Sequence, residues 1–308
     1  GGSTSVDESG TTDTFTIVLD AQPASNVVIA MSSSDTGEAT LSGTLSFTNA
    51  NWDTPQTVTV TGVDENIIDG NQTSTITITI VDSISDNDFS AVADQTVTAT
   101  ITDDDTAGFT IVETGGSTEV AESGTTDSFT IVLDAEPASD VVLTVTSSDT
   151  GEATVNTPLT FTNANWDTPQ TVTITGVDDN LVDGNIGSTI TIAVDDANSN
   201  DDFDAVADQT VTATTTDDDT AGFTVTETDG STEVAESGTT DTFTVILDSQ
   251  PASDVVLTVT SADTGEATVT STLTFTPLNW DTPQTATVTG VDDSLIDGNI
   301  DSTITIAV

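Results

Sequence analysis

Carboxylates are the only charged side chains in this sequence. Its 308 residues include 53 Asp and Glu but no Lys, Arg or His, which gives a formal net charge of −53. Cys and Tyr are absent as well, so the chain has no thiolate, imidazole or amine for catalysis and cannot form a disulfide. Nucleic acids and anionic membrane surfaces are bound through Lys and Arg, so neither is an expected partner. The chemistry left to the side chains is that of oxygen ligands.

The carboxylates lie mainly in short segments that the hydrophobic pattern places between strands. In residues 107–220 the acids between strands include Glu122, Asp149, the run Asp178-Asp179-Asn-Leu-Val-Asp183 and the triplet Asp217-Asp218-Asp219. Adjacent like charges repel, and the chain supplies no cationic side chain between them. The compensating cation must come from solution. Ca²⁺ is the natural candidate because it takes about six to eight oxygen ligands, whereas softer metals select His or Cys.

Two familiar calcium-binding motifs do not fit these segments. An EF-hand starting at Asp179 would place Leu181 at its third position and Ile190 at its twelfth, where a bidentate Glu belongs. The glycine-rich nonapeptide of β-roll proteins is absent. A calcium site must therefore be assembled from separate loops.

The segments between the acids have the pattern of β-strands. Apolar residues, mostly β-branched, alternate with Thr between Gly, Asp, Asn and Pro clusters, and no helical periodicity or membrane-spanning apolar run is present. This patterning also argues against disorder. The pattern predicts strands near 108–113, 127–135, 140–147, 153–162 with a break at Pro158, 168–176, 187–194 and 208–216. The predicted core residues are Phe129, Ile131, Leu133, Val172, Ile174, Ile190 and Ile192, and Trp166 is predicted to be a packing residue.

The chain repeats itself at a fixed interval. Trp52, Trp166 and Trp280 are each 114 residues apart, and the segment Asn-Trp-Asp-Thr-Pro-Gln surrounds all three. We therefore predict an all-β, immunoglobulin-like tandem array of seven-stranded sandwiches. Repeat 1 (1–106) lacks the first strand, repeat 2 (107–220) is complete, and repeat 3 (221–308) lacks the last strand. The expectation is that the chain is a window on a longer array.

Two acidic segments and the strand between them resemble the Calx-beta family. Val172-Thr-Ile-Thr-Gly-Val-Asp178-Asp179-Asn-Leu-Val-Asp183 is followed by Thr210-Val-Thr-Ala-Thr-Thr-Thr-Asp217-Asp218-Asp219-Thr-Ala-Gly222-Phe. The Asn-Trp-Asp-Thr-Pro-Gln-Thr-Val-Thr block resembles repeats of large bacterial extracellular adhesins. The resemblance implies a seven-stranded immunoglobulin-like sandwich with a calcium cluster formed by loops at one end.

The resemblance also implies which residues hold the calcium. In repeat 2 they are Glu122, Asp149, Asp178, Asp179, the backbone carbonyl of Leu181, Asp183, Asp217, Asp218 and Asp219. The 114-residue offset gives Glu8, Asp35, Asp64, Glu65, Ile67, Asp69, Asp103, Asp104 and Asp105 in repeat 1. In repeat 3 it gives Glu236, Asp263, Asp292, Asp293, Leu295 and Asp297. The Calx-beta family includes the calcium-sensing domains of sodium/calcium exchangers. Gly184 and Ile186 stand where those domains have further acids, so fewer or weaker ion sites are expected.

The resulting functional hypothesis is a non-enzymatic structural protein. We expect a secreted or cell-surface bacterial stalk or fibre stiffened by Ca²⁺, whose partners are neighbouring repeats, with self-association into a filament left open and no membrane insertion. One alternative is a calcium-dependent carbohydrate-binding module, and another is an acidic, salt-adapted repeat without specific calcium sites. Paired carboxylates can hydrolyse glycosides, but here the acids are adjacent in sequence and repeat in every copy, which disfavours an enzyme.

Overall fold

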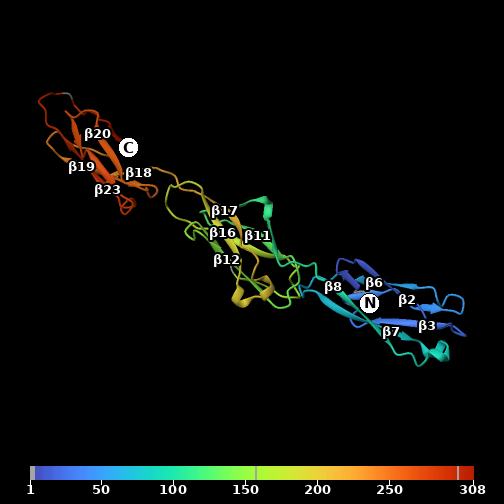
Figure 1. Cartoon of the computed structure of the whole chain (residues 1–308). Helices are drawn as coiled ribbons and strands as arrows, with labels where there is room; N and C mark the ends of the chain where they lie inside the picture. Colours follow the sequence, from blue (N-terminus) through green and yellow to red (C-terminus); the bar gives the residue numbers. More distant parts are fainter. Residues whose placement is uncertain (1–3, 157, 297) are drawn as a thin grey trace.

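The computed structural model describes residues 4–156, 158–296 and 298–308. In this part the chain forms 24 β-strands and six short 3₁₀ turns, with no α-helix. Figure 1 shows three β-units that follow one another along an elongated molecule. None of the described helical turns is long or apolar enough to cross a bilayer. The predicted all-β, tandem sandwich architecture is confirmed.

Repeat 2 is a sandwich of two sheets. Its strands are β9 (Phe109–Glu113), β10 (Thr118–Ala121), β11 (Thr126–Leu133), β12 (Val141–Ser147), β13 (Ala153–Val155), β14 (Leu159–Phe161), β15 (Gln170–Gly176), β16 (Ile186–Val194) and β17 (Gln209–Thr216). Its 3₁₀ turns are η3 (Thr114–Gly116), η4 (Asp196–Asn198) and η5 (Asp201–Phe203). One sheet has the order β13-β15-β11-β9 and the other the order β10-β17-β16-β12-β14.

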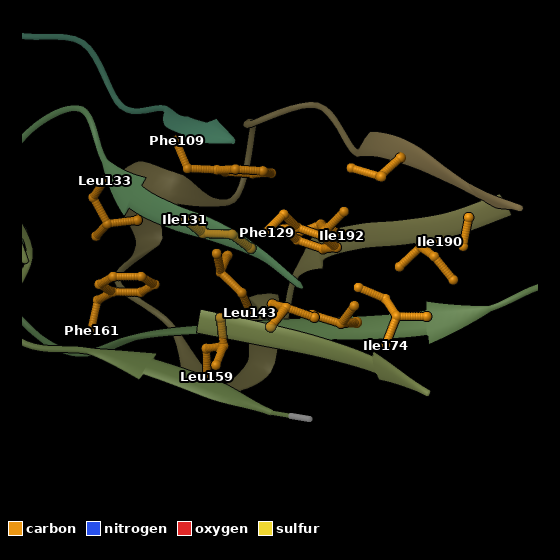
Figure 2. Close-up of a cluster of buried hydrophobic side chains, with 14 of the residues drawn as sticks. Phe109, Phe129, Ile131, Leu133, Leu143, Leu159, Phe161, Ile174, Ile190 and Ile192 are labelled. Atoms are coloured by element: carbon orange, nitrogen blue, oxygen red, sulfur yellow. The ribbon is translucent and has the colours of Figure 1, made fainter. Parts of the chain in front are cut away.

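The core of repeat 2 lies between these sheets, as Figure 2 shows. All seven core residues predicted from the alternation are at most 2% exposed. Phe109, Phe161 and Phe203 complete the cluster, and Trp166 packs against its edge. The alternation of apolar residues with Thr in the sequence therefore corresponds to strands with one face in the core and the other face outside it.

Repeat 2 has nine strands where seven were predicted, because the segment 153–162 forms two strands, β13 and β14, and because β10 was not predicted from the sequence. β10 has four residues and runs parallel to β17, with Thr118 opposite Ala213 and Ala121 opposite Thr216. Val120 is only 3% exposed and belongs to the core. β10 thus depends on a partner strand more than 90 residues further along the chain.

Repeat 1 contains the same strands except the counterpart of β9. Its strands are β1 (Thr4–Asp7), β2 (Thr12–Ile17), β3 (Val27–Ser33), β4 (Ala39–Leu41), β5 (Leu45–Phe47), β6 (Gln56–Gly62), β7 (Gln72–Ile80) and β8 (Gln95–Thr102), with turns η1 (Asp82–Ile84) and η2 (Asn87–Phe89). The sheets have the orders β1-β8-β7-β3-β5 and β2-β6-β4. β1 pairs parallel to β8 as β10 pairs with β17.

Repeat 3 is the least complete of the three. Its strands are β18 (Phe223–Glu227), β19 (Thr240–Leu247), β20 (Val255–Ser261), β21 (Ala267–Val269), β22 (Thr272–Phe275), β23 (Gln284–Gly290) and β24 (Ile304–Ala307), with the turn η6 (Thr228–Gly230). The sheets have the orders β18-β19-β23-β21 and β22-β20-β24. Its described residues provide no counterpart of β10 or β17.

Candidate metal centre

The parallel strand pairs of repeats 1 and 2 bring their acids together. In repeat 2 the pairing continues past the end of β10, because the backbone N–H of Glu122 donates to the carbonyl of Thr216, the last residue of β17, at 3.1 Å. Glu122 therefore lies beside the triplet 217–219. In repeat 1 the N–H of Glu8 donates to the carbonyl of Thr102, also at 3.1 Å.

A glycine brings a third segment to the same end of the sandwich. Gly176 is the last residue of β15, and a Cβ at this position would collide with the backbone carbonyl of Ala121 at the end of β10. Gly62 and Gly290 lie in the same situation in repeats 1 and 3. The lack of a side chain lets the backbones approach, and the chain then enters the acidic run 178–183 next to Glu122.

Side-chain hydrogen bonds hold the acidic loops to one another. The carboxylate of Asp217 accepts from the N–H groups of Gly184 at 2.7 Å and Asp219 at 2.8 Å. In repeat 1 the carboxylate of Asp103 accepts from Gly70 and Asp105, each at 2.8 Å. One carboxylate per repeat thus fixes two loops without help from a cation.

The acids of these loops also form compact groups of carboxylate oxygens. In repeat 2, Glu122 is shared by two groups, one with Asp217 and Asp219 and one with Glu152 and Asp183. Within each group the oxygens lie within 4.8 Å of one another. Repeat 1 has two groups of the same kind around Glu8; they comprise Glu65 with Asp69, and Asp103 with Asp105.

The acids at the centre of these groups are deeply buried. Glu8 is 0% exposed, Glu122 1% and Glu152 7%. Neither carboxylate oxygen of Glu8 has a hydrogen-bond partner among the described residues, and one oxygen each of Glu122, Glu152, Asp105 and Asp219 is also without one. Buried charge without a partner costs several kcal/mol. The fold therefore leaves a deficit of positive charge at this end of repeats 1 and 2.

The same burial raises the pKa values of these acids. Burial, reinforced by the negative charges of three neighbouring acids, raises the pKa of Glu122 from 4.5 to about 7, although a hydrogen bond from the N–H of Asp218 acts in the opposite direction. Burial and four neighbouring acids raise the pKa of Glu8 to about 7 as well. Burial also raises the pKa values of Glu38 and Glu152.

These groups fit a hard cation. Their donors are carboxylate oxygens from loops, several of them buried and without a partner, and the chain has no His or Cys to attract a softer metal. Glu122 is shared between two groups, so it could contribute one oxygen to each. In repeat 2 the residues that would hold the cation are Glu122, Glu152, Asp183, Asp217 and Asp219.

The structure gathers about half of the ligands predicted for repeats 1 and 2. It brings together Glu8, Glu65, Asp69, Asp103 and Asp105 in repeat 1, and Glu122, Asp183, Asp217 and Asp219 in repeat 2. Outside these groups lie Asp35, Asp64, Asp104, Asp149, Asp178, Asp179 and Asp218. The carboxylates of Asp35 and Asp149 instead accept from the N–H groups of Gly37 and Gly151, each at 2.9 Å.

The ligands predicted for repeat 3 do not form a group in its described part. Glu236, Asp263, Asp292, Asp293 and Leu295 lie among residues that form no compact carboxylate group, and Asp297 lies outside the described residues. Glu236 is half-buried, in contrast to Glu8 and Glu122. The counterparts of the triplet would fall after residue 308.

One group member was missed in the sequence. Glu152 immediately precedes β13, and its backbone carbonyl accepts from Val177 at 2.9 Å and from the hydroxyl of Thr215 at 3.2 Å. These bonds fix Glu152 between two of the strands that lead into the site. The signal was the segment Thr-Gly-Glu-Ala-Thr, which occurs at Glu38, Glu152 and Glu266.

The carboxylate groups lie where one repeat meets the next. At the first junction Ile67 pairs with Glu136 of repeat 2 in a parallel bridge, and the N–H of Glu136 donates to the carbonyl of Asn66 at 2.6 Å. Ile68 packs against the core of repeat 2. Only Thr106, Ala107 and Gly108 separate Asp105 from β9.

The second junction repeats this arrangement. Leu181 pairs with Gln250 of repeat 3, whose N–H donates to the carbonyl of Asn180 at 2.7 Å. The hydroxyl of Ser249 lies 3.0 Å from both the Asp219 carboxylate and the Thr220 carbonyl. Ile67 and Leu181, predicted as carbonyl ligands, are thus the residues that bridge to the following repeat.

Comparisons with known proteins find similarity among solved structures only. No protein-family model matches the chain, and no curated protein matches it in sequence. CBD12 from CALX1.2 is 15% identical, with 63% of this chain and 76% of that chain covered and a TM-score of 0.27. Domains 4 and 5 of the S-layer protein SbsC are 16% identical, with 61% and 70% covered and a TM-score of 0.30. At these values the sandwich fold and the carboxylate groups rest on this chain's own strands and side chains.

Proposed function

We propose that this chain is the repeat region of an extracellular bacterial stalk or fibre whose inter-repeat junctions are stiffened by Ca²⁺. The observation that carries the proposal is the burial of uncompensated carboxylates beside the loops that pair with the next repeat. The all-oxygen donor set favours Ca²⁺, and extracellular modules bind it in the range of about 10⁻⁴–10⁻³ M. The proposed role is structural, because the acids of each group lie in contact rather than across a cleft.

Different residues supply the charge and the inter-repeat pairing at each junction. The buried Glu8 and Glu122 hold negative charge at the end of the sandwich, and the runs 64–69 and 178–183 carry both acids and the backbone that pairs with the following repeat. A bound cation supplies the missing positive charge. Neutralising the repulsion between these loops would favour the one arrangement in which their backbone pairs with the next repeat.

Without a cation, the same loops repel one another. The Glu136 carboxylate of repeat 2 adds to the charge at the first junction, since it contributes to the raised pKa of Glu65. A calcium-free junction is therefore expected to open and bend more freely. The predicted consequence is a flexible string of sandwiches that becomes a stiff rod as calcium binds.

Small-angle X-ray scattering of the 308-residue chain tests this proposal. In excess Ca²⁺ the maximum dimension of the chain should be larger than in chelator at the same ionic strength. The range of conformations that fits the scattering should also be narrower. The matched control is the double variant Glu8→Gln and Glu122→Gln, which keeps side-chain shape and should respond less. Identical scattering curves for the unmodified chain with and without calcium would contradict the proposal.

A further inference from the structure

The two junctions between repeats differ at two adjacent residues of the following repeat. Ala135 and Glu136 follow β11 in repeat 2, and Ser249 and Gln250 follow β19 at the same positions in repeat 3. The backbone N–H groups of Glu136 and Gln250 donate to carbonyls in the acidic runs of repeats 1 and 2, respectively. Each pair of residues therefore lies against the acidic run of the preceding repeat.

The first residue of each pair differs in whether it can donate a hydrogen bond to the carboxylate group. The hydroxyl of Ser249 lies 3.0 Å from one carboxylate oxygen of Asp219, whose other oxygen is buried without a partner among the described residues. Ala135 takes this place at the first junction and has no side-chain donor for Asp105, the counterpart of Asp219. The hydroxyl thus offsets part of the negative charge at the second junction only.

The second residue of each pair differs in charge and in what its side chain can bind. The side-chain N–H of Gln250 donates to the carbonyl of Pro277 at 2.9 Å, and Gln22 makes the same bond in repeat 1. A carboxylate has no N–H, so Glu136 cannot make this bond to its own repeat. Its charge acts on the preceding repeat instead, where burial and, after it, the charges of four acids, Glu136 among them, raise the pKa of Glu65.

We propose that these two residues of the following repeat set the calcium affinity of each junction, and that the first junction binds Ca²⁺ more tightly than the second. The inference rests on the proposed function and names what regulates its sites. Compared with the second junction, the first has one more carboxylate and one fewer hydroxyl donor. Calcium affinity rises with the negative charge around the ion. The first junction therefore stiffens at a lower calcium concentration, so that the chain stiffens in steps.

Hydrogen exchange of the intact 308-residue chain over a series of calcium concentrations tests the proposal. The calcium midpoint for slowed exchange at residues 64–69 should be about three- to tenfold lower than that at 178–183. Glu136→Gln should raise the first midpoint by a similar factor and leave the second unchanged. Ser249→Ala combined with Gln250→Glu should lower the second midpoint alone. Both variants change only the following repeat, so the ligands of the preceding repeat stay the same.

The matched control is Asp140→Asn, which removes the charge of an exposed acid in the same loop as Glu136 and should move neither midpoint. In chelator, Glu136→Gln should slow exchange at residues 64–69, because one repelling charge is lost. Equal midpoints at the two junctions, or a shift for Glu136→Gln no larger than that for Asp140→Asn, would overturn the inference and leave the proposed function intact. Calcium that slowed exchange at neither junction would overturn both.

Discussion

The same four residues form a strand in repeat 2 but not in repeat 3. Thr118–Ala121 and Thr232–Ala235 both read Thr-Glu-Val-Ala, yet only the first forms β10. The difference is the partner, because β17 lies beside the first segment and no described strand lies beside the second. Local sequence is thus insufficient here, and the long-range parallel pairing decides whether the strand forms.

The carboxylate site differs between repeats 2 and 3 in the same way. Glu122 comes directly after β10 and is 1% exposed, whereas Glu236 follows the unpaired segment and remains half-buried. Repeat 3 therefore serves as an internal control for repeat 2, with most of the same acids and a different surrounding structure. The four predictions below change one side of this comparison at a time.

The largest effect is expected from converting repeat 2 into the state of repeat 3. Val211 is 5% exposed in β17, and the substitution Val211→Asp would bury a charge without a partner in the strand that supports β10. We expect a loss of about 3 kcal/mol or more in the free energy of unfolding of repeat 2. Hydrogen exchange of residues 118–121 should become as fast as that of residues 232–235.

The matched control for this variant is Thr212→Asp. Thr212 is adjacent in the strand but exposed, so the same new charge should cost less than about 0.5 kcal/mol. If both variants left residues 118–121 protected, pairing with β17 would not be what maintains β10.

The second prediction concerns calcium binding in repeat 2. The double variant Asp217→Asn and Asp219→Asn removes two charges from the group while keeping the side-chain size. At a calcium concentration 100 times the dissociation constant, the unmodified repeat should gain about 2.7 kcal/mol, and the variant should lose most of this gain. Thermal unfolding followed with and without calcium measures it.

The double variant Asp202→Asn and Asp208→Asn is the control for the change in net charge, because both acids are exposed residues of the same repeat. This pair changes the net charge equally but should leave the calcium effect intact. Asp218→Asn provides a finer comparison, because Asp218 is exposed and lies outside the group. An effect of Asp218→Asn as large as that of the Asp217 and Asp219 pair would refute the assignment.

The third prediction is a pH dependence of the calcium-free protein. The pKa of Glu8 and of Glu122 is raised from 4.5 to about 7 in the folded state, so the folded protein binds more protons than the unfolded chain in this interval. Stability should therefore fall as the pH rises from 4.5 to 7 and level off above it. Each kcal/mol lost corresponds to about 4–8 °C in the melting temperature of a domain of this size.

Melting curves in chelator at pH 5 and pH 8 check this prediction. Glu122→Gln should flatten the response of repeat 2, because the amide does not titrate. Stability that rises with pH over this range would contradict the inferred burial of uncompensated acids.

The smallest effect is expected at the second junction. Ser249 is 7% exposed and can donate its hydroxyl proton to the Asp219 carboxylate or to the Thr220 carbonyl. The first junction has Ala135 at this position. We expect Ser249→Ala to cost about 1 kcal/mol or less and to leave the calcium affinity of repeat 1 unchanged. A calorimetric titration that showed weakened binding in repeat 1 would contradict this local role.

More of the fold than of the carboxylate site could be predicted from the sequence. Strands with period-two alternation and the core residues Phe129 and Ile174 follow from local patterning, which reports burial on two-sided strands. β10 was missed because four residues carry little pattern and their partner lies more than 90 residues away. Pairings of this kind are set by tertiary context rather than by local propensity.

The predicted metal ligands were also limited by what local sequence can show, here the direction of a side chain. Asp149 and Glu152 lie in one loop, and both are acidic. Asp149 turns its carboxylate to the N–H of Gly151, whereas Glu152 leads into β13 and is buried beside Glu122. The sequence predicted that an acid of this loop would lie in the site. Which of the two acids lies there depends on the direction of its side chain, and this cannot be predicted from the sequence.

Calcium-dependent hydrogen exchange on the whole chain tests the central claim most directly. The claim is that cations bind where buried carboxylates meet the next repeat. It predicts slower exchange on adding calcium at 64–69, 103–106 and 135–136, and at the matching residues 178–183, 217–220 and 249–250. Residues 292–296 of repeat 3 should change little. No protection at either junction, or equal protection in 292–296, would contradict the account.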